Sequence, residues 1–176
     1  LACGAKRLRV CRAVLLSRGG PCAEQQELQV LAAQRLDLAR YNRRTGRIDV
    51  TPLGPGLADD VVPIDEAELR RRHELGDAPV VLTVSAKRPH KNLMRLLDAV
   101  ALLESEPVLV LPGYPTPHEA ELKARAAYLG VRAVFPAWVS PEDLEGLYAE
   151  AAAFVFPSLA EGFGLPVLEA MARGVP

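Results

Sequence analysis

The sequence lacks a long apolar run and an excess of charge of either sign. Its formal net charge is −1 over 176 residues, which favours neither a nucleic-acid surface nor electrostatic attachment to a membrane. No apolar stretch approaches the roughly 20 residues that a membrane-spanning helix requires. The only apolar piece near the beginning, "AVLL" between basic residues, is too short for a secretory signal. We therefore expect a globular, cytoplasmic protein without a transmembrane segment.

Cysteine is scarce and confined to one end of the chain, at Cys3, Cys11 and Cys22. This spacing matches no C-x-x-C pair and no histidine lies nearby in the sequence, so no zinc site is expected. An odd number of cysteines also argues against a disulfide framework, which leaves free thiols in a reducing cytosol. The same segment, 1–23, lacks hydrophobic periodicity, and we expect it to be poorly ordered or atypical of the fold.

The rest of the chain has a regular alternation of apolar and amphipathic stretches. Apolar runs, read as strands, lie at 79–85, 107–113, 131–136 and 152–157. Helical patterns lie at 24–43, 65–75, 92–104, 117–129 and 141–151, with one further short strand at 48–51. Fully apolar strands that alternate with helices indicate an α/β fold, with a Rossmann-like parallel sheet covered by helices on both faces. Ligands of such sheets bind at the carboxyl ends of the strands, here in loops 85–91, 112–116, 136–140 and 157–165.

The last of these loops contains two glutamates eight residues apart, in "SLAEGFGLPVLEAMARG". Pro166 suits the first turn of a helix at 165–172, which places Glu161 in the loop and Glu169 one turn into the helix. Glycines allow close backbone approach, and N–H groups at a helix start attract anions. Two carboxylates beside an anion pocket suit a ligand with both hydroxyls and phosphate, such as a nucleotide-sugar. The alternative is a glycine-rich turn with two solvated glutamates.

Basic residues follow the first sheet strand, in "SAKRPHKNL". Lys87, Arg88 and Lys91 could neutralise a diphosphate at this edge, although a solvated charged loop is the simpler alternative. Gly113 ends the second apolar run, and the backbone near Trp138 could hold a nucleobase. The competing interpretation there is a plain turn with Trp138 in the core.

Together these motifs resemble the C-terminal, donor-binding domain of the glycosyltransferase group 1 family, the GT-B enzymes often called family 4. The resemblance covers residues 45–176. It rests on four motifs: "HKNL", "LPG", "VSPEDLEGLYAEAAAFVFPS" and "EGFGLPVLEAMARGVP". The last is the most specific, because it is similar to the E-x7-E motif of the family.

The resemblance assigns roles to individual residues. Glu161, the candidate catalytic residue, would face the donor sugar, and Glu169 would bind the nucleotide ribose. Backbone amides of Phe163, Gly164 and Leu165 would approach the sugar and the phosphate, while Lys91 would neutralise the diphosphate. No metal or other cofactor is implied, because cationic side chains and a helix N-terminus take the charge of the leaving diphosphate.

The chain also departs from the pattern of the family. Ser85 and Ala86 stand where the family usually has Gly-Arg, which leaves Lys87 and Arg88 as candidate replacements for the arginine. The resemblance also implies that the given sequence, which ends at Pro176, stops where the family continues and lacks the N-terminal acceptor-binding domain of the family.

We therefore expect a fragment in three parts. These parts are the atypical segment 1–23, a helix and crossover at 24–56, and an incomplete nucleotide-sugar-binding domain at 57–176.

The predicted function is hexosyl transfer, with retention, from a nucleoside diphosphate sugar to an unknown acceptor, which could be a glycan, a lipid or a small molecule. The isolated fragment is expected to be inactive, and the missing domain could make peripheral contact with a membrane. A GT-B epimerase or phosphorylase explains the glutamate loop less well. The alternative from another class is a non-catalytic Rossmann-like module for nucleotide binding or protein interaction.

Overall fold

The computed structural model describes residues 60–161 and 163–176. The predictions made for segment 1–23, for the helix at 24–43 and for the strand at 48–51 concern residues outside this part of the chain.

Four short parallel strands form one sheet. They are β1 (Val80–Leu82), β2 (Val108–Val110), β3 (Ala133–Val134) and β4 (Ala151–Phe154). The order across the sheet is β3-β2-β1-β4, and every pairing is parallel. All residues of β1 and β2 are buried, as expected for strands that are apolar on both faces. The predicted parallel sheet is confirmed.

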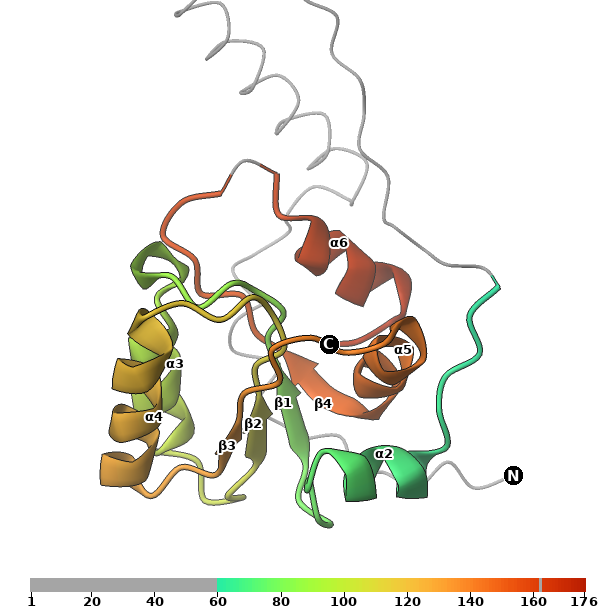
Figure 1. Ribbon diagram of the computed structural model, residues 1–176, viewed down its shortest axis with the longest axis horizontal. Helices are drawn as coiled ribbons and strands as arrows, with labels where there is room; N and C mark the ends of the chain where they lie inside the picture. Colours follow the sequence, from blue (N-terminus) through green and yellow to red (C-terminus); the bar gives the residue numbers. More distant parts are fainter. Residues whose placement is uncertain (1–59, 162) are drawn as a thin grey trace, which may run out of the picture.

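Helices cover both faces of the sheet (Figure 1). They are α2 (Glu66–Arg72), the 3₁₀ helix η3 (Pro89–Lys91), α3 (Leu93–Val100), α4 (His118–Leu129), α5 (Pro141–Glu150) and α6 (Leu165–Ala172). Helices α3 and α4 pack on one face, while α2, α5 and α6 lie on the other (Figure 1). The fold is therefore the α/β, Rossmann-like arrangement that the alternating pattern predicts.

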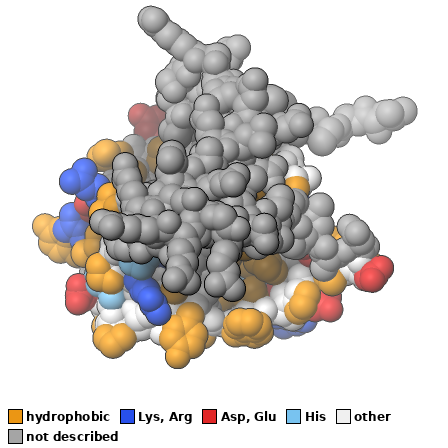
Figure 2. Space-filling view, turned by 90° about the horizontal axis from the view of Figure 1, so that it is seen from above, with side chains coloured by type: hydrophobic (Ala, Val, Ile, Leu, Met, Phe, Trp, Pro, Cys, Tyr) orange, Lys and Arg blue, Asp and Glu red, His pale blue; other side chains and the backbone are white. Residues whose placement is uncertain are grey.

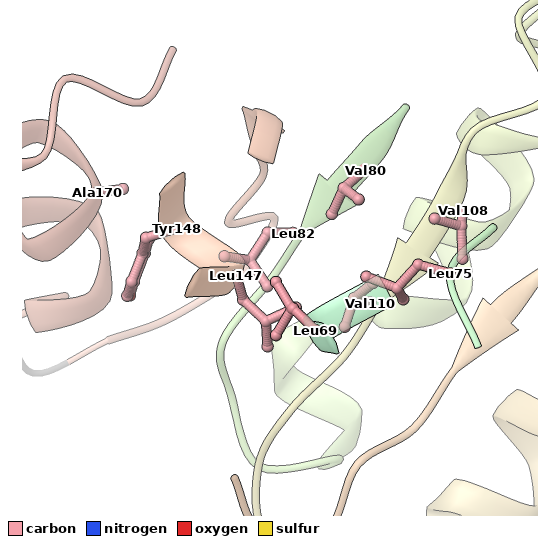
Figure 3. Close-up of a cluster of buried hydrophobic side chains, with 9 residues drawn as sticks. All are labelled: Leu69, Leu75, Val80, Leu82, Val108, Val110, Leu147, Tyr148 and Ala170. Carbon is pink, nitrogen blue, oxygen red and sulfur yellow. The ribbon is translucent and has the colours of Figure 1, made fainter. Parts of the chain in front are cut away.

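Two cores result, one on each face of the sheet. Successive residues of a strand point to opposite faces, so Val80 and Leu82 enter one core and Val81 enters the other. The first core also contains Leu69 and Leu147 (Figure 3). Burial of such aliphatic side chains contributes about 1.5–3 kcal/mol each, which makes the two cores the main stabilising feature of the fold.

Several helix boundaries agree with their sequence signals. Ser140 Oγ accepts a hydrogen bond from the N–H of Asp143 at 3.1 Å, and Pro141 begins α5. Gly174 has φ of 68° just after α6, as a glycine C-cap requires. Two boundaries were wrong. Helix α2 ends at Arg72 and not at residue 75, because Glu74 has φ of 53° and cannot continue the helix. Helix α3 ends at Val100 and not at residue 104. The chain must turn there to begin β2, and Glu106, which precedes Pro107, has φ of 44°.

Exposed large apolar side chains are spread over several elements. In Figure 2, apolar groups lie at separate places around the rim, with charged groups between them. These exposed residues include Leu102, Tyr114, Tyr128 and Trp138. Trp138 is 89% exposed, so the interpretation that placed it in the core was wrong. Within the described part of the chain, no helix is both long and apolar enough to cross a membrane.

Candidate functional site

The sheet order creates a switch point between β1 and β4. From β1 the chain moves outward to β2 and β3, and it then returns to place β4 on the other side of β1. The helix after β1 packs on one face and the helix after β4 packs on the opposite face. The loops that follow these two strands therefore diverge, and ligands of open α/β sheets bind in the crevice that such a divergence leaves.

Lys91 and Glu161 meet across this switch point. Lys91 Nζ lies 2.5 Å from Glu161 Oε1, although the residues are 70 positions apart in the chain. The two side chains are 15% and 26% exposed, so a ligand can reach them. The same ammonium lies 5.4 Å from the centre of the Phe156 ring. The structure thus brings together the predicted diphosphate cation and the predicted catalytic carboxylate.

The environment of Glu161 favours its charged form. Desolvation raises the pKa of this carboxyl, but hydrogen bonding and charge from Lys91, with contributions from Ser158 and His90, outweigh desolvation and hold the pKa below its ordinary value. Glu161 is therefore a carboxylate at neutral pH. It can accept hydrogen bonds from hydroxyl groups but has no proton to donate as a general acid.

Two further hydrogen bonds fasten the loop after β1 to the loop after β4. The side-chain amide of Asn92 donates to the carbonyl oxygen of Pro157 at 3.1 Å, and the N–H of Leu159 donates to the carbonyl oxygen of His90 at 2.9 Å. Asn92 has φ of 57°, a left-handed conformation that asparagine tolerates better than most residues. Sequence reasoning missed this role. The available signal was an asparagine directly before a helix start.

Glu169 has different partners from Glu161. It lies on α6, and its Oε2 accepts a hydrogen bond from the Tyr148 hydroxyl at 3.0 Å. The guanidinium of Arg173 lies 4.6 Å from the centre of the Tyr148 ring and donates to Glu145 Oε2 at 2.7 Å. The two glutamates are therefore not a symmetrical acid/base pair. Neither Tyr148 nor Arg173 was identified from the sequence.

The start of α6 contains the other predicted donor-binding residues. Gly164 is the residue before the helix and has φ of 86°, so a residue with a side chain would be strained there. Phe163 and Leu165 flank it and are half-buried. Pro166 lies in the first turn, as predicted, where its missing N–H breaks no helical hydrogen bond. This helix start follows the Glu161 loop and supplies N–H groups and a positive dipole end to the same edge of the sheet.

Lys87 differs from the expectation of a phosphate-binding cation. Its side chain is fully buried, and its ammonium donates to the carbonyl oxygens of Gly113 and of Pro136, the latter at 3.0 Å. Burial is the main cause that lowers the pKa of Lys87 to about 8; the charge of Glu119 opposes this shift, and the charge of Lys123 adds to it. These contacts direct the ammonium into the protein, between the strand ends. Lys87 supplies the donor for the Gly113 carbonyl oxygen, whereas the Pro136 carbonyl oxygen also accepts from the N–H of Gly113 at 3.1 Å.

Arg88, the other candidate replacement, lies exposed at the start of η3. The two residues before the lysine, Ser85 and Ala86, are half-buried.

Gly113 has a structural reason to be glycine. Its φ is 141°, and a Cβ atom at this position would lie 2.1 Å from the carbonyl oxygen of Ser85. The loops after β1 and β2 therefore approach each other so closely here that no side chain fits. The proposed contact of Gly113 with a donor stays a prediction.

Among residues 60–161 and 163–176, no three His, Cys, Asp or Glu side chains are grouped so that they could hold a metal ion.

The fold and the contacts define a Rossmann-like domain with a candidate ligand site at its switch point, and comparison with known proteins identifies its family. Residues 65–176 match the family of Glycosyl transferases group 1. This match covers more than half of the chain, which therefore belongs to the group 1 glycosyl transferases.

Two relatives illustrate the similarity. O-antigen chain mannosyltransferase B of Escherichia coli is 36% identical over 146 residues, which cover 77% of this chain. The D-inositol 3-phosphate glycosyltransferase of Corynebacterium efficiens is 33% identical over 183 residues, which cover 96% of this chain. The chain spans only 38% and 42% of the length of these two relatives.

Solved structures of Anabaena Alr3699/HepE share the fold. The complex with UDP and glucose superposes with a TM-score of 0.71 at 23% identity, covering 83% of this chain and 41% of that protein. The complex with UDP gives a TM-score of 0.56 at 27% identity, covering 63% of this chain and 32% of that protein. These neighbours have the GT-B architecture.

Proposed function

We propose that this chain is the donor-binding half of a retaining glycosyltransferase. It binds a nucleoside diphosphate sugar, and the hexosyl group passes with retention of configuration to an acceptor bound by a further domain. The observation that carries this proposal is the Lys91–Glu161 contact at the switch point between β1 and β4. A cation and a carboxylate placed side by side suit a ligand that carries a diphosphate next to a polyhydroxyl group.

In this proposal the diphosphate binds between Lys91 and the start of α6. Ammonium groups and helix N-termini both stabilise phosphate charge, and that charge increases when the sugar leaves. No metal is needed for this step, and EDTA should leave binding unchanged. The diphosphate replaces Glu161 as the partner of Lys91, and the released carboxylate accepts hydrogen bonds from sugar hydroxyls. Glu161 is thus the proposed catalytic residue, acting on the sugar, and Glu169 binds the ribose.

The relatives support the class of donor. The Escherichia coli relative is a mannosyltransferase, and the Anabaena protein was solved in complex with UDP. GDP-mannose and UDP-glucose are therefore the first donors to test. We place the activity in the cytoplasm, and we expect the isolated chain to bind a donor without transferring it.

Isothermal titration of the chain with UDP, GDP, UDP-glucose and GDP-mannose tests the proposal. At least one of these ligands should bind, and Lys91→Met should weaken that binding roughly tenfold or more, because a charge-assisted contact to phosphate is lost.

Lys123→Met is the matched control. Like Lys91, Lys123 pairs with a carboxylate, Glu119 at 2.7 Å, and lies near an aromatic ring, Phe135 at 5.6 Å. The Lys123→Met variant should bind the nucleotides with the wild-type affinity. Absence of binding by the folded chain, or equal binding by Lys91→Met, would favour the non-catalytic module instead.

A further inference from the structure

Tyr148 is an almost fully buried side chain to which the proposed function gives no role. It lies on α5, is 1% exposed, and comes from an element outside the loops that form the candidate site. Its hydroxyl nevertheless donates a hydrogen bond to Glu169 Oε2. A tyrosine that only filled the core could be replaced by phenylalanine, so the hydroxyl needs a separate explanation.

The ring of Tyr148 is held from more than one side. The guanidinium of Arg173 lies 4.6 Å from the ring centre, and the ring centre of Phe154 on β4 lies 5.9 Å away. Arg173 is itself fixed by two hydrogen bonds to Glu145 and by one to the backbone carbonyl of Glu169 at 2.9 Å. The hydroxyl therefore occupies a defined position relative to the backbone of α6.

The hydroxyl is also a permanent donor. Burial raises the pKa of the Tyr148 phenol, and the charge of Glu169 and the hydrogen bond to it raise this pKa further. The phenol thus keeps its proton over the whole physiological range. A carboxylate has two oxygens, and among the described residues no donor is bound to the second one, Glu169 Oε1.

We propose that Tyr148 is a positioning residue that fixes the Glu169 carboxylate plane, so that Oε1 is presented to a ribose hydroxyl of the bound nucleotide. This inference rests on the proposed function and adds a source of selectivity for ribose. A carboxylate whose side chain rotates freely loses conformational entropy when it binds a hydroxyl. A carboxylate already held at one oxygen loses less of this entropy.

The test compares each nucleotide with its 2′-deoxy and 3′-deoxy analogues. The wild-type chain should bind UDP or GDP roughly tenfold or more tightly than at least one deoxy analogue, because a hydrogen bond to a charged group is lost. Tyr148→Phe should reduce this discrimination to about threefold or less while preserving the ring packing. In a Glu169→Gln background, Tyr148→Phe should change the discrimination no further.

Tyr128→Phe is the matched control. Tyr128 is 80% exposed on α4 and has a guanidinium, that of Arg125, 5.4 Å from its ring centre, as Tyr148 has that of Arg173. The Tyr128→Phe variant should keep the wild-type preference for the ribonucleotide over its deoxy analogue. Thermal melting of each variant measures any purely structural effect separately.

Two results would overturn the inference in distinguishable ways. If Tyr148→Phe lowers the melting temperature but keeps the wild-type preference for the ribonucleotide, Tyr148 is structural only and the proposed function stands. If the folded wild-type chain binds neither UDP nor GDP, the proposed function fails, and the role of Tyr148 in ribose binding fails with it.

Discussion

Two lysines in the loop after β1 have opposite environments. The ammonium of Lys87 is buried and contacts backbone carbonyls of two other loops, whereas that of Lys91 is partly exposed and contacts the carboxylate of Glu161. Both are cations at the carboxyl edge of the sheet, and both were predicted to bind diphosphate. The difference shows that a cation at this edge can serve either the loops themselves or a ligand, depending on which acceptors surround it.

The largest expected effect on stability is at Gly113, whose carbonyl oxygen contacts the buried Lys87. Gly113→Ala should lower the free energy of unfolding by about 3 kcal/mol or more, because the new Cβ meets the Ser85 carbonyl and the left-handed backbone is strained. Urea denaturation measures this loss. Gly130→Ala is the control, since its φ is 68° but nothing lies within 4 Å of the added Cβ. It should cost about 1–2 kcal/mol. Equal losses for both variants would contradict the close approach of the two loops.

Lys87→Met should have the next largest effect. Methionine fills a similar volume but leaves the carbonyl of Gly113 without its donor and removes one of the two donors to the carbonyl of Pro136. We expect a cost of about 2 kcal/mol in the free energy of unfolding. The removal of a buried charge offsets part of the loss. Urea denaturation, with Lys123→Met as the control, checks this expectation. A Lys87→Met protein as stable as wild type would mean that the Gly113 carbonyl needs no donor from Lys87.

Lys91→Met should have a small effect on stability, in contrast to Lys87→Met. The pair with Glu161 is partly exposed, and such pairs contribute about 0–1 kcal/mol. The same denaturation experiment measures it. If Lys91→Met destabilised the protein as much as Lys87→Met, both lysines would be structural. The proposed difference, in which Lys87 stabilises the loops and Lys91 binds a ligand, would then be wrong.

The smallest expected effect is a pH dependence from Glu161. Its pKa is lowered in the folded state, so the unfolded chain binds more protons as the pH falls below the ordinary glutamate value of about 4.3. The stabilisation from the Lys91 contact is therefore complete above that value and is lost as the pH falls through the folded-state pKa. The difference in free energy of unfolding between wild type and Glu161→Gln should shrink between neutral and acidic pH. A constant difference would exclude a Glu161-specific contribution.

Local sequence signals predicted the elements well. Apolar runs identified all four strands of the described part, and the cap residues Ser140 and Gly174 marked helix ends, because these effects act within a few residues. The "HKNL" and "EGFGLPVLEAMARG" motifs marked two loops with candidate donor-binding residues, but they did not predict that these loops meet. Their contact follows from strand order, and the order β3-β2-β1-β4 belongs to the fold as a whole.

The direction of individual loop side chains could not be predicted in this way. The carbonyl groups that hold Lys87 lie 26 and 49 residues further along the chain, so no local pattern indicates them. The hydroxyl that holds Glu169 likewise comes from a different helix. Trp138 is apolar by type, but its loop exposes it. In each case the outcome depends on tertiary neighbours that a sequence pattern does not encode.

The pairing of β1 with β4 has a consequence for folding kinetics. The β1–β2 and β2–β3 pairs join neighbouring segments, but the candidate site needs β4 beside β1 and a contact between residues 70 positions apart. Loop closure makes such distant contacts slow to form, so we expect the Lys91–Glu161 contact to form late, after the β1–β2–β3 part has collapsed. Under the proposed function, a nucleotide added during refolding would then bind only in the final phase, and the rate at which binding appears would report the docking of the last strand.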